Sequence, residues 1–261
     1  MHYSRTGGNK PPLILSHGIT DSGLCWVPIA RDLEEFFDII MVDARGHGLS
    51  ESPPTGYSVE TMVKDLIGLI KGLELDRPIL MGHSMGAQIS ARTASLAPHL
   101  VDKLILEDPA FNSGIPLVPH FIFKRVMKFL LARMLINPLK DLSPDEIQAK
   151  CKKDNPKWSE DEILHWTDSK VQFLQKNPIQ MIGSLTKSMP KNWGKMVTGI
   201  ECPVLLIISD KGMTKKEVAI ELTEKIWKNS EFVEIKNAGH NIRRENSVDF
   251  MKAVKGFLAI E

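Results

Sequence analysis

One short stretch in the first third of the chain combines an apolar run, a glycine-flanked serine and a helix-like pattern. Residues 77–81 lead into Gly-His-Ser-Met-Gly at 82–86, and small and apolar residues follow at 87–91. A Gly-x-Ser-x-Gly turn between a strand and a helix lifts the serine clear of the sheet, because side chains at the glycines would collide with the reversing backbone. The pattern predicts a nucleophile elbow with Ser84 at its tip; a plain turn is the alternative for the motif taken alone.

An activated serine needs a base, which comes from a distant part of the chain when such residues converge in space. His240 lies in a loop just after the strand-like run 232–235, near the end of the chain. The other seven of the eight histidines lie in the elbow, in other turns, near the amino terminus or in helical stretches. His240 is therefore the predicted general base, consistent with the chain order nucleophile, acid, base.

Two carboxylates compete for the third position, which must orient the imidazole and stabilise its charged form. Asp210 ends the apolar run 204–209, and Asp108 ends the run 104–107. Both are expected at the carboxyl edge of a parallel sheet, where ligands bind in open α/β folds. We favour Asp210, while Asp108 stays the alternative, its structural role being that of a loop-capping residue before Pro109.

Backbone N–H groups must also stabilise the oxygen that becomes negative when a serine attacks a carbonyl group. One predicted donor is Met85, which follows the nucleophile. The other is Ile19, in the loop after the strand-like run that ends in His17-Gly18. In this interpretation the His17 ring braces the loop, and Gly18 lets the backbone bend toward the substrate.

Together these motifs resemble the α/β-hydrolase fold family, in its esterase and lipase-like type with a helical cap. The resemblance covers nearly the whole chain and rests on the elbow, His17-Gly18, the stretch 43–50, the Asp210 strand end and Gly239-His240. It implies an α/β fold in which a mainly parallel sheet has helices on both faces. It also implies that Ser84, His240 and Asp210 form a Ser-His-Asp triad.

Two features depart from the family pattern. Many members place the acid slightly further into the loop after the penultimate strand, where this chain has Lys211-Gly212-Met213. The chain also starts Met-His-Tyr-Ser-Arg, so we expect the first strand of the usual sheet to be missing or truncated.

The identity of the nucleophile restricts the chemistry that the resemblance implies. Members that cleave carbon–halogen bonds or epoxides carry aspartate at the elbow, whereas Ser84 favours acyl transfer. We therefore predict a serine hydrolase that cleaves carboxylic esters or related acyl compounds. Carbon–carbon bond hydrolysis or cofactor-free perhydrolysis on the same triad stays open, as does a triad-retaining small-molecule receptor. No cofactor is predicted, because Gly46-His47-Gly48 lacks the third glycine of a dinucleotide fingerprint.

Composition limits the partners and the compartment. The chain has 261 residues, 43% of them hydrophobic and 25% charged, which suits one large α/β domain with an insertion. A formal net charge of +1 gives no electrostatic reason to expect nucleic acid. Three widely spaced cysteines predict neither disulfides nor a metal site. Without a secretion signal or a run of eighteen apolar residues, we expect a cytoplasmic protein with no stable membrane insertion; its oligomeric state is left open.

Strand-like runs stop between residues 111 and 198, where helical spacing replaces them. Helix starts are expected at Ser143 and Ser159, each followed by acidic residues. We predict a hydrolase core of residues 1–110 and 199–261 and a helical cap of residues 111–198. One apolar helix face is expected from Ile122, Val126, Phe129, Leu130 and Met134.

The predicted cap is rich in large apolar side chains. Most are expected to pack the cap itself, but as a set they favour a small-molecule, ester-like substrate with an apolar acyl or aryl group. Basic residues lie among the apolar ones of its first helix, and we interpret them as a solvated face rather than a membrane-binding surface. The apolar residues are Phe111, Phe121, Phe123, Phe129, Trp158, Trp166, Phe173, Trp193, Met127, Met134, Met181, Met189 and Met196; the basic ones are Lys124, Arg125, Lys128 and Arg133.

Overall fold

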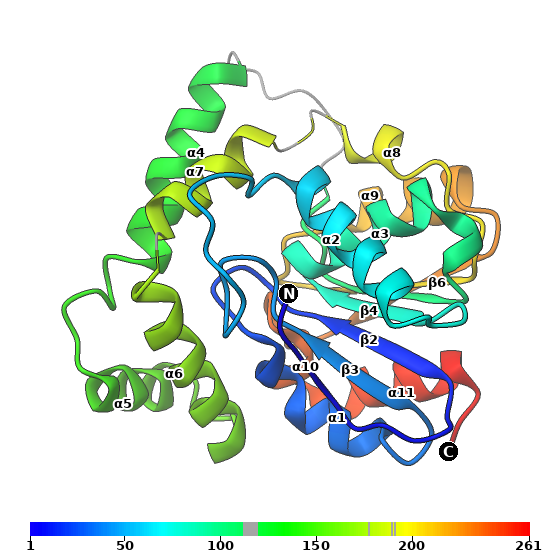
Figure 1. Ribbon diagram of the computed structural model, residues 1–261, viewed down its shortest axis with the longest axis horizontal. Coiled ribbons are helices and arrows are strands. Elements are labelled where there is room, and N and C mark those ends of the chain that lie inside the picture. Colours follow the sequence, from blue (N-terminus) through cyan, green and yellow to red (C-terminus); the bar gives the residue numbers. More distant parts are fainter. Residues whose placement is uncertain (112–119, 177, 189, 191) are drawn as a thin grey trace.

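A seven-stranded sheet forms the centre of the molecule (Figure 1). The structure, a computed structural model, describes residues 1–111, 120–176, 178–188, 190 and 192–261. The strands lie in the order β1-β3-β2-β4-β5-β6-β7, and within these ranges β1 alone runs antiparallel to its neighbour. Their bounds are β1 Tyr3–Arg5, β2 Pro12–Ser16, β3 Asp38–Val42, β4 Ile79–His83, β5 Leu104–Glu107, β6 Val204–Ser209 and β7 Ser230–Ile235.

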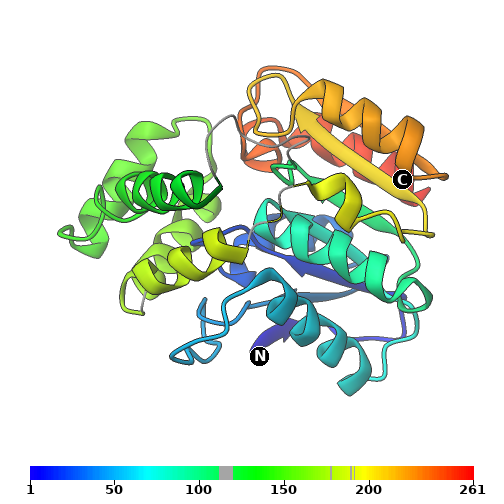
Figure 2. The ribbon, with the colours of Figure 1, turned by 90° about the horizontal axis from the view of Figure 1, so that it is seen from above.

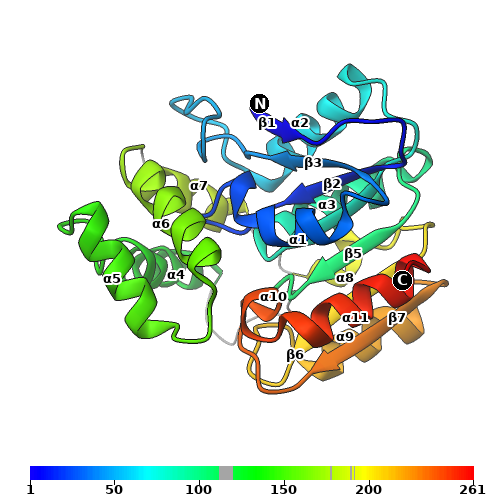
Figure 3. The same ribbon diagram turned by 90° about the horizontal axis from the view of Figure 1, so that it is seen from below.

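Helices cover both faces of the sheet, so the predicted mainly parallel α/β fold is confirmed. Helices α1 and α11 cover one face, and α2, α3, α8 and α9 lie on the other (Figures 1 and 3). None of the helices in the described ranges is long and apolar enough to cross a bilayer. The bounds are α1 Val27–Leu33, α2 Val59–Gly72, α3 Met85–Leu96, α8 Trp193–Met196, α9 Lys216–Glu221, α10 Ile242–Glu245 and α11 Ser247–Leu258, with shorter turns at Gly23–Trp26, Pro98–Leu100 and Leu222–Ile226.

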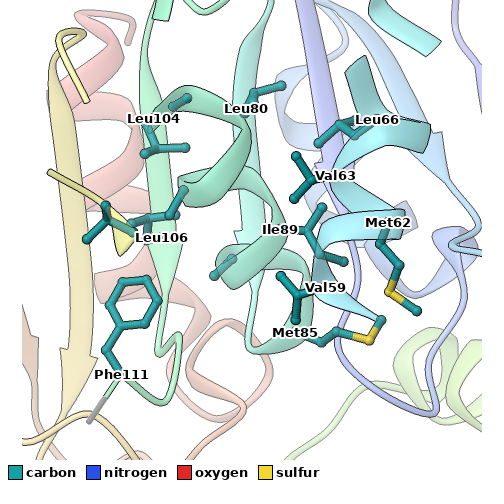
Figure 4. Packing of buried hydrophobic residues seen from close by; sticks show 14 of the residues in the cluster. Val59, Met62, Val63, Leu66, Leu80, Met85, Ile89, Leu104, Leu106 and Phe111 are labelled. Carbon is teal, nitrogen blue, oxygen red and sulfur yellow. The ribbon is translucent and has the colours of Figure 1, made fainter. Parts of the chain in front are cut away.

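The central strands are buried on both faces, so alternate residues enter two separate clusters. In β6, Val204, Leu206 and Ile208 belong to the cluster on the α9 side of the sheet, whereas Leu205 and Ile207 belong to the cluster on the α11 side. This period of two is the geometry of a strand. Figure 4 shows side chains of α2 and α3 interlocking over β4 and β5. The two clusters hold the carboxyl ends of the strands in fixed register.

A helical insertion, defined here as α4 to α8, separates β5 from β6 in the chain. Helices α4 to α7 lie beside the sheet in all three views (Figures 1, 2 and 3). Helix α6 contacts the turn at Gly23–Trp26, and the α7 residue Ser188 accepts a 3.3 Å hydrogen bond from the backbone of Val59. The described part of 111–198 contains no strand. The further bounds are α4 His120–Leu135, α5 Pro144–Asp154, α6 Glu160–Leu174 and α7 Pro178–Ser188.

Both predicted helix starts in the insertion are confirmed. The Ser143 and Ser159 side chains accept hydrogen bonds from the backbone of Glu146 and Glu162 at the starts of α5 and α6. The division into core and cap at the predicted boundaries stays a prediction. Of the expected apolar face of α4, Val126, Phe129, Leu130 and Met134 are exposed. The residue Met189 and the side chains of Phe121, Ile122, Phe123, Lys124 and Met127 lie outside the described part.

The two edges of the sheet differ from its centre. The amino-terminal strand β1 has three residues and pairs antiparallel with β3, so a short strand occupies this edge. At the opposite edge, β7 carries Glu234, whose carboxylate contacts Lys216 at 3.0 Å and Lys236 at 2.8 Å. Charged side chains thus line this margin of the sheet.

The reversal from β4 into α3 depends on two glycines. A Cβ on Gly86 would lie 2.1 Å from the carbonyl oxygen of Ser16 at the end of β2. A Cβ on Gly82 would lie 2.5 Å from the backbone of Gly86. Both contacts are with backbone, which cannot rotate away as a side chain can. The first turn of α3 therefore lies directly against the ends of β2 and β4.

This packing predicts opposite effects for two glycine substitutions. Gly86→Ala should cost about 1–3 kcal/mol or more, because the backbone must shift to admit the methyl group. Gly68→Ala on the exposed side of α2, where a Cβ meets no atom within 4 Å, should gain about 0.5–1 kcal/mol through helix propensity. Urea unfolding of both variants measures the difference, and a Gly86→Ala protein as stable as the wild type would contradict the prediction.

Candidate active site

Ser84 stands between β4 and α3 in a backbone conformation that serine seldom adopts. Its φ is 51° and its ψ is −113°, and its N–H donates to the carbonyl of Glu107 on β5 over 2.9 Å. Left-handed backbone at a non-glycine residue costs about 1–3 kcal/mol and persists only where the surroundings enforce it. Here the close packing of α3 on β2 enforces it. The serine lies where the elbow motif predicts, at the edge formed by the strand ends.

The ring of His240 lies beside the elbow and is held from two sides. Its Nδ1 makes a 2.7 Å hydrogen bond to Oδ2 of Asp108. The neighbouring His83 ring lies 4.7 Å away between centroids, and its Nε2 donates to the carbonyl oxygen of His240 over 3.0 Å. These contacts hold the imidazole beside His83, the residue that directly precedes Ser84. With Nδ1 occupied, Nε2 is the ring nitrogen left for proton transfer.

The acid at the ring is Asp108 and not Asp210, which corrects the preference drawn from the sequence. Asp108 is fully buried, and the backbone N–H groups of Met213 and Thr214 donate to its two oxygens over 2.8 and 2.7 Å. Its φ of 38° lies in the left-handed region, directly after the last residue of β5. Asp210 is exposed, and the loop that follows it instead supplies the amides that hold Asp108.

The two predicted oxyanion donors belong to segments that adjoin the serine. Met85 is the first residue of α3, and the first N–H groups of a helix have no partner within it. Ile19 follows Gly18, where a Cβ would lie 3.5 Å from Cβ of Ser84 and 2.7 Å from Nδ1 of His83. The loop after β2 therefore passes directly against the elbow. The roles of both amides stay predictions.

His17 braces this loop, as the sequence indicates. Its Nδ1 donates to the carbonyl of Gly18 over 2.7 Å, and its Nε2 accepts from the backbone of Ala44 over 3.0 Å. The ring also lies 4.9 Å from that of His47, which stacks on Phe173 of α6 at 5.4 Å. These contacts join the loops after β2 and β3 to the helical insertion.

Burial keeps three histidines around the site neutral. His17, His47 and His83 are at most 3% exposed, and loss of hydration lowers the pKa of each ring. For His47 and His83 the pKa lies well below its ordinary value. At neutral pH none of the three rings therefore carries a positive charge.

The contact of Glu107 with Arg243, beside the site, could not be predicted from the sequence. Glu107, which precedes Asp108, accepts from the backbone of Arg243 over 2.9 Å and pairs with its guanidinium over 2.8 Å. Burial raises the pKa of Glu107, although the nearby Arg243 opposes this effect. This pair fastens α10, just after His240, to the end of β5. A carboxylate inside the apolar run 104–107 was the available signal.

Several large apolar residues of the predicted cap are buried in the core. Phe111 and Trp193 are each 1% exposed, and their rings lie 5.0 Å apart. Phe173 is equally buried against His47. In the ranges that the structure describes, no group of three or more His, Cys, Asp or Glu side chains is arranged to hold a metal ion.

Comparison with known proteins decides the family. A family model described as the alpha/beta hydrolase fold matches residues 11–246. The chain belongs to the α/β-hydrolase fold family. It is therefore an α/β hydrolase.

Individual relatives agree with this placement. The chain is 29% identical over 274 residues to a putative esterase/lipase of Haemophilus influenzae, covering 99% of this chain and 86% of the relative. It is 39% identical over 104 residues to a 2-(acetamidomethylene)succinate hydrolase of Mesorhizobium japonicum, covering 40% of this chain and only 37% of that relative. The crystal structure of an E-2-(acetamidomethylene)succinate hydrolase superposes with a TM-score of 0.77 at 21% identity, covering 98% and 94% of the two chains. At that identity the superposition shows the fold alone.

The buried histidines predict how stability depends on pH. Their pKa values are lowered on folding, so below about pH 6.5 the unfolded chain binds protons that the folded chain does not. The free energy of unfolding should therefore decrease as the pH is lowered through this range, by up to about 1.4 kcal/mol per pH unit for each histidine. Urea unfolding between pH 7.5 and 5.5 measures this slope. His47→Leu should make it shallower, and an unchanged slope in that variant would count against a neutral His47.

Proposed function

We propose that this chain is a serine hydrolase of carboxylic esters and related acyl compounds, in which Ser84, His240 and Asp108 form the catalytic triad. The observation that carries the proposal is the 2.7 Å contact between Asp108 and the His240 ring, next to a serine on a strained strand-to-helix turn. A serine so placed has its base oriented by a third group, which is the arrangement that nucleophilic catalysis requires.

In the proposed mechanism, Nε2 of His240 takes the hydroxyl proton as Ser84 Oγ attacks the substrate carbonyl carbon. Asp108 fixes the ring with its Nδ1–H toward the carboxylate and stabilises the imidazolium. The amides of Ile19 and Met85 stabilise the oxyanion. His240 then protonates the leaving group, and a water activated by the same ring releases the acid and regenerates Ser84.

The names of two relatives support acyl substrates. One is a putative esterase/lipase, and the other is a hydrolase of 2-(acetamidomethylene)succinate, a compound with an acetamide group. The share of apolar residues in the insertion favours an apolar acyl or aryl group, although its most buried aromatic residues pack within the core. We therefore propose small esters first and N-acyl compounds second, acting without a cofactor and in the cytoplasm.

Replacement of Ser84 tests the nucleophile. Ser84→Ala should abolish covalent labelling by a fluorophosphonate probe and lower the turnover of p-nitrophenyl esters by several orders of magnitude, because the attacking oxygen is lost. A panel of acyl chain lengths, extended to N-acetyl and N-formyl compounds, identifies the preferred acyl group. Full turnover by the alanine variant would refute the assignment, and binding without turnover by the wild type would favour a receptor.

A matched pair of aspartate substitutions tests the acid. Asp108→Asn should lower kcat about 10⁴-fold, since the amide cannot hold the required tautomer of His240. Asp210→Asn, at the exposed residue, should leave kcat within a few-fold of the wild type. Circular dichroism spectra of both variants check the fold. The reverse order of effects would return the role to Asp210.

A further inference from the structure

The loop after β2 closes into a turn that threonine strains. The N–H of Asp21 donates to the carbonyl of Gly18 over 3.2 Å, so Ile19 and Thr20 are the two central residues. Thr20 has a φ of 72° and is 3% exposed. A positive φ at the third residue of a turn normally calls for glycine or asparagine. A contact from outside the turn must therefore stabilise this conformation of Thr20. The same turn contains the Ile19 N–H, in the peptide group between Gly18 and Ile19.

That contact comes from the helical insertion. The ammonium group of Lys170 on α6 donates to the carbonyl oxygen of Thr20 over 3.0 Å and to Oδ1 of Asp21 over 2.5 Å. The Lys170 side chain is only 6% exposed and lies 4.6 Å over the Trp166 ring. One buried cation thus fixes both the strained residue and the residue that closes the turn.

The same carboxylate is also tied to the segment that follows His240. Arg244 of α10 donates to Oδ2 of Asp21 over 3.1 Å and to Glu162 of α6 over 2.8 Å. Nη2 of Arg243 lies 3.7 Å from Oδ2 of Asp21. Asp21 therefore joins three segments that are distant in the sequence: the turn after β2, the insertion and the helix beyond the base.

Three cations keep the Asp21 carboxylate charged although it is buried. Burial alone raises the pKa of the Asp21 carboxyl group, but Arg244, Lys170 and Arg243 hold that pKa well below its ordinary value. Asp21 is thus ionised at neutral pH. Removing one partner from a buried ionic group leaves an uncompensated charge, so loss of either cation that donates to Asp21 should destabilise the turn.

We infer that Lys170 and Asp21 are positioning residues for the oxyanion site: they hold the turn at Gly18, Ile19, Thr20 and Asp21 so that the Ile19 N–H faces the substrate oxygen. The inference rests on the proposed serine hydrolase function. It assigns to the insertion a part in stabilising the transition state, in addition to contact with the substrate. The lysine acts through the turn and touches no reacting atom.

Substitution of the lysine separates this role from simple packing. Lys170→Met should lower kcat about 10²-fold with KM changed less than threefold, since the loss of an oxyanion donor costs about that much. Binding of an aryl trifluoromethyl ketone, whose serine adduct carries an oxyanion, should weaken by a similar factor. Lys170→Arg, which keeps the cation, should recover most of both losses.

Lys152→Met is the matched control. Lys152 lies on α5 of the same insertion and pairs with Glu160 at the surface, so its replacement should leave kcat and ketone affinity at wild-type values. Equal losses in the two methionine variants, or wild-type kcat and ketone affinity in Lys170→Met, would overturn the inference.

Thr20→Gly provides a second route if Lys170→Met does not fold. Glycine adopts the left-handed conformation without strain, so Thr20→Gly combined with Lys170→Met should fold and retain more activity than Lys170→Met alone. A double variant as inactive as, or more inactive than, the lysine variant would contradict the role assigned to the turn.

Failure of the inference differs from failure of the proposed function. If the wild type is not labelled at Ser84 by a fluorophosphonate, the serine hydrolase proposal fails and the positioning role falls with it. If the wild type is labelled and Ser84→Ala is not, while Lys170→Met keeps wild-type kcat and ketone affinity, the positioning role alone is wrong.

Discussion

The carboxylate of Asp108 is the contact on which the geometry of the candidate site depends. Two amides of the loop after β6 donate to it, and it holds the ring of a histidine from the loop after β7. One buried side chain therefore joins the ends of three neighbouring strands. Its loss would leave the N–H groups of Met213 and Thr214 without an acceptor and the His240 ring without an orientation, so structure and proposed chemistry depend on the same oxygens.

Most of the fold could be predicted because its determinants are local. Runs of three to five apolar residues specify the buried parallel strands β2 to β6, and the spacing of glycines around Ser84 specifies the reversal into α3. Strand β1 could not be predicted in this way. Its three residues form a strand only because β3 supplies the hydrogen bonds, and that partner lies more than thirty residues away.

The site was predictable to the extent that each residue has a local signature. The elbow serine and the histidine after the last strand have one. Asp108 and Asp210 do not differ locally, since both follow buried strands at the same edge; a left-handed backbone and two amides from a distant loop decide between them. The buried position of Lys170 could not be predicted for the same reason, because a lysine within a helix resembles a surface residue until its buried partner is known.

The margins of the sheet have a consequence for association between copies of the chain. Continuous sheets between molecules grow when a long, flat edge offers unpaired backbone groups. One margin here ends in a three-residue strand, and the other carries Glu234 between two lysines. Strand addition at either side would leave few backbone pairs or bury charge. Self-assembly by edge pairing is therefore disfavoured.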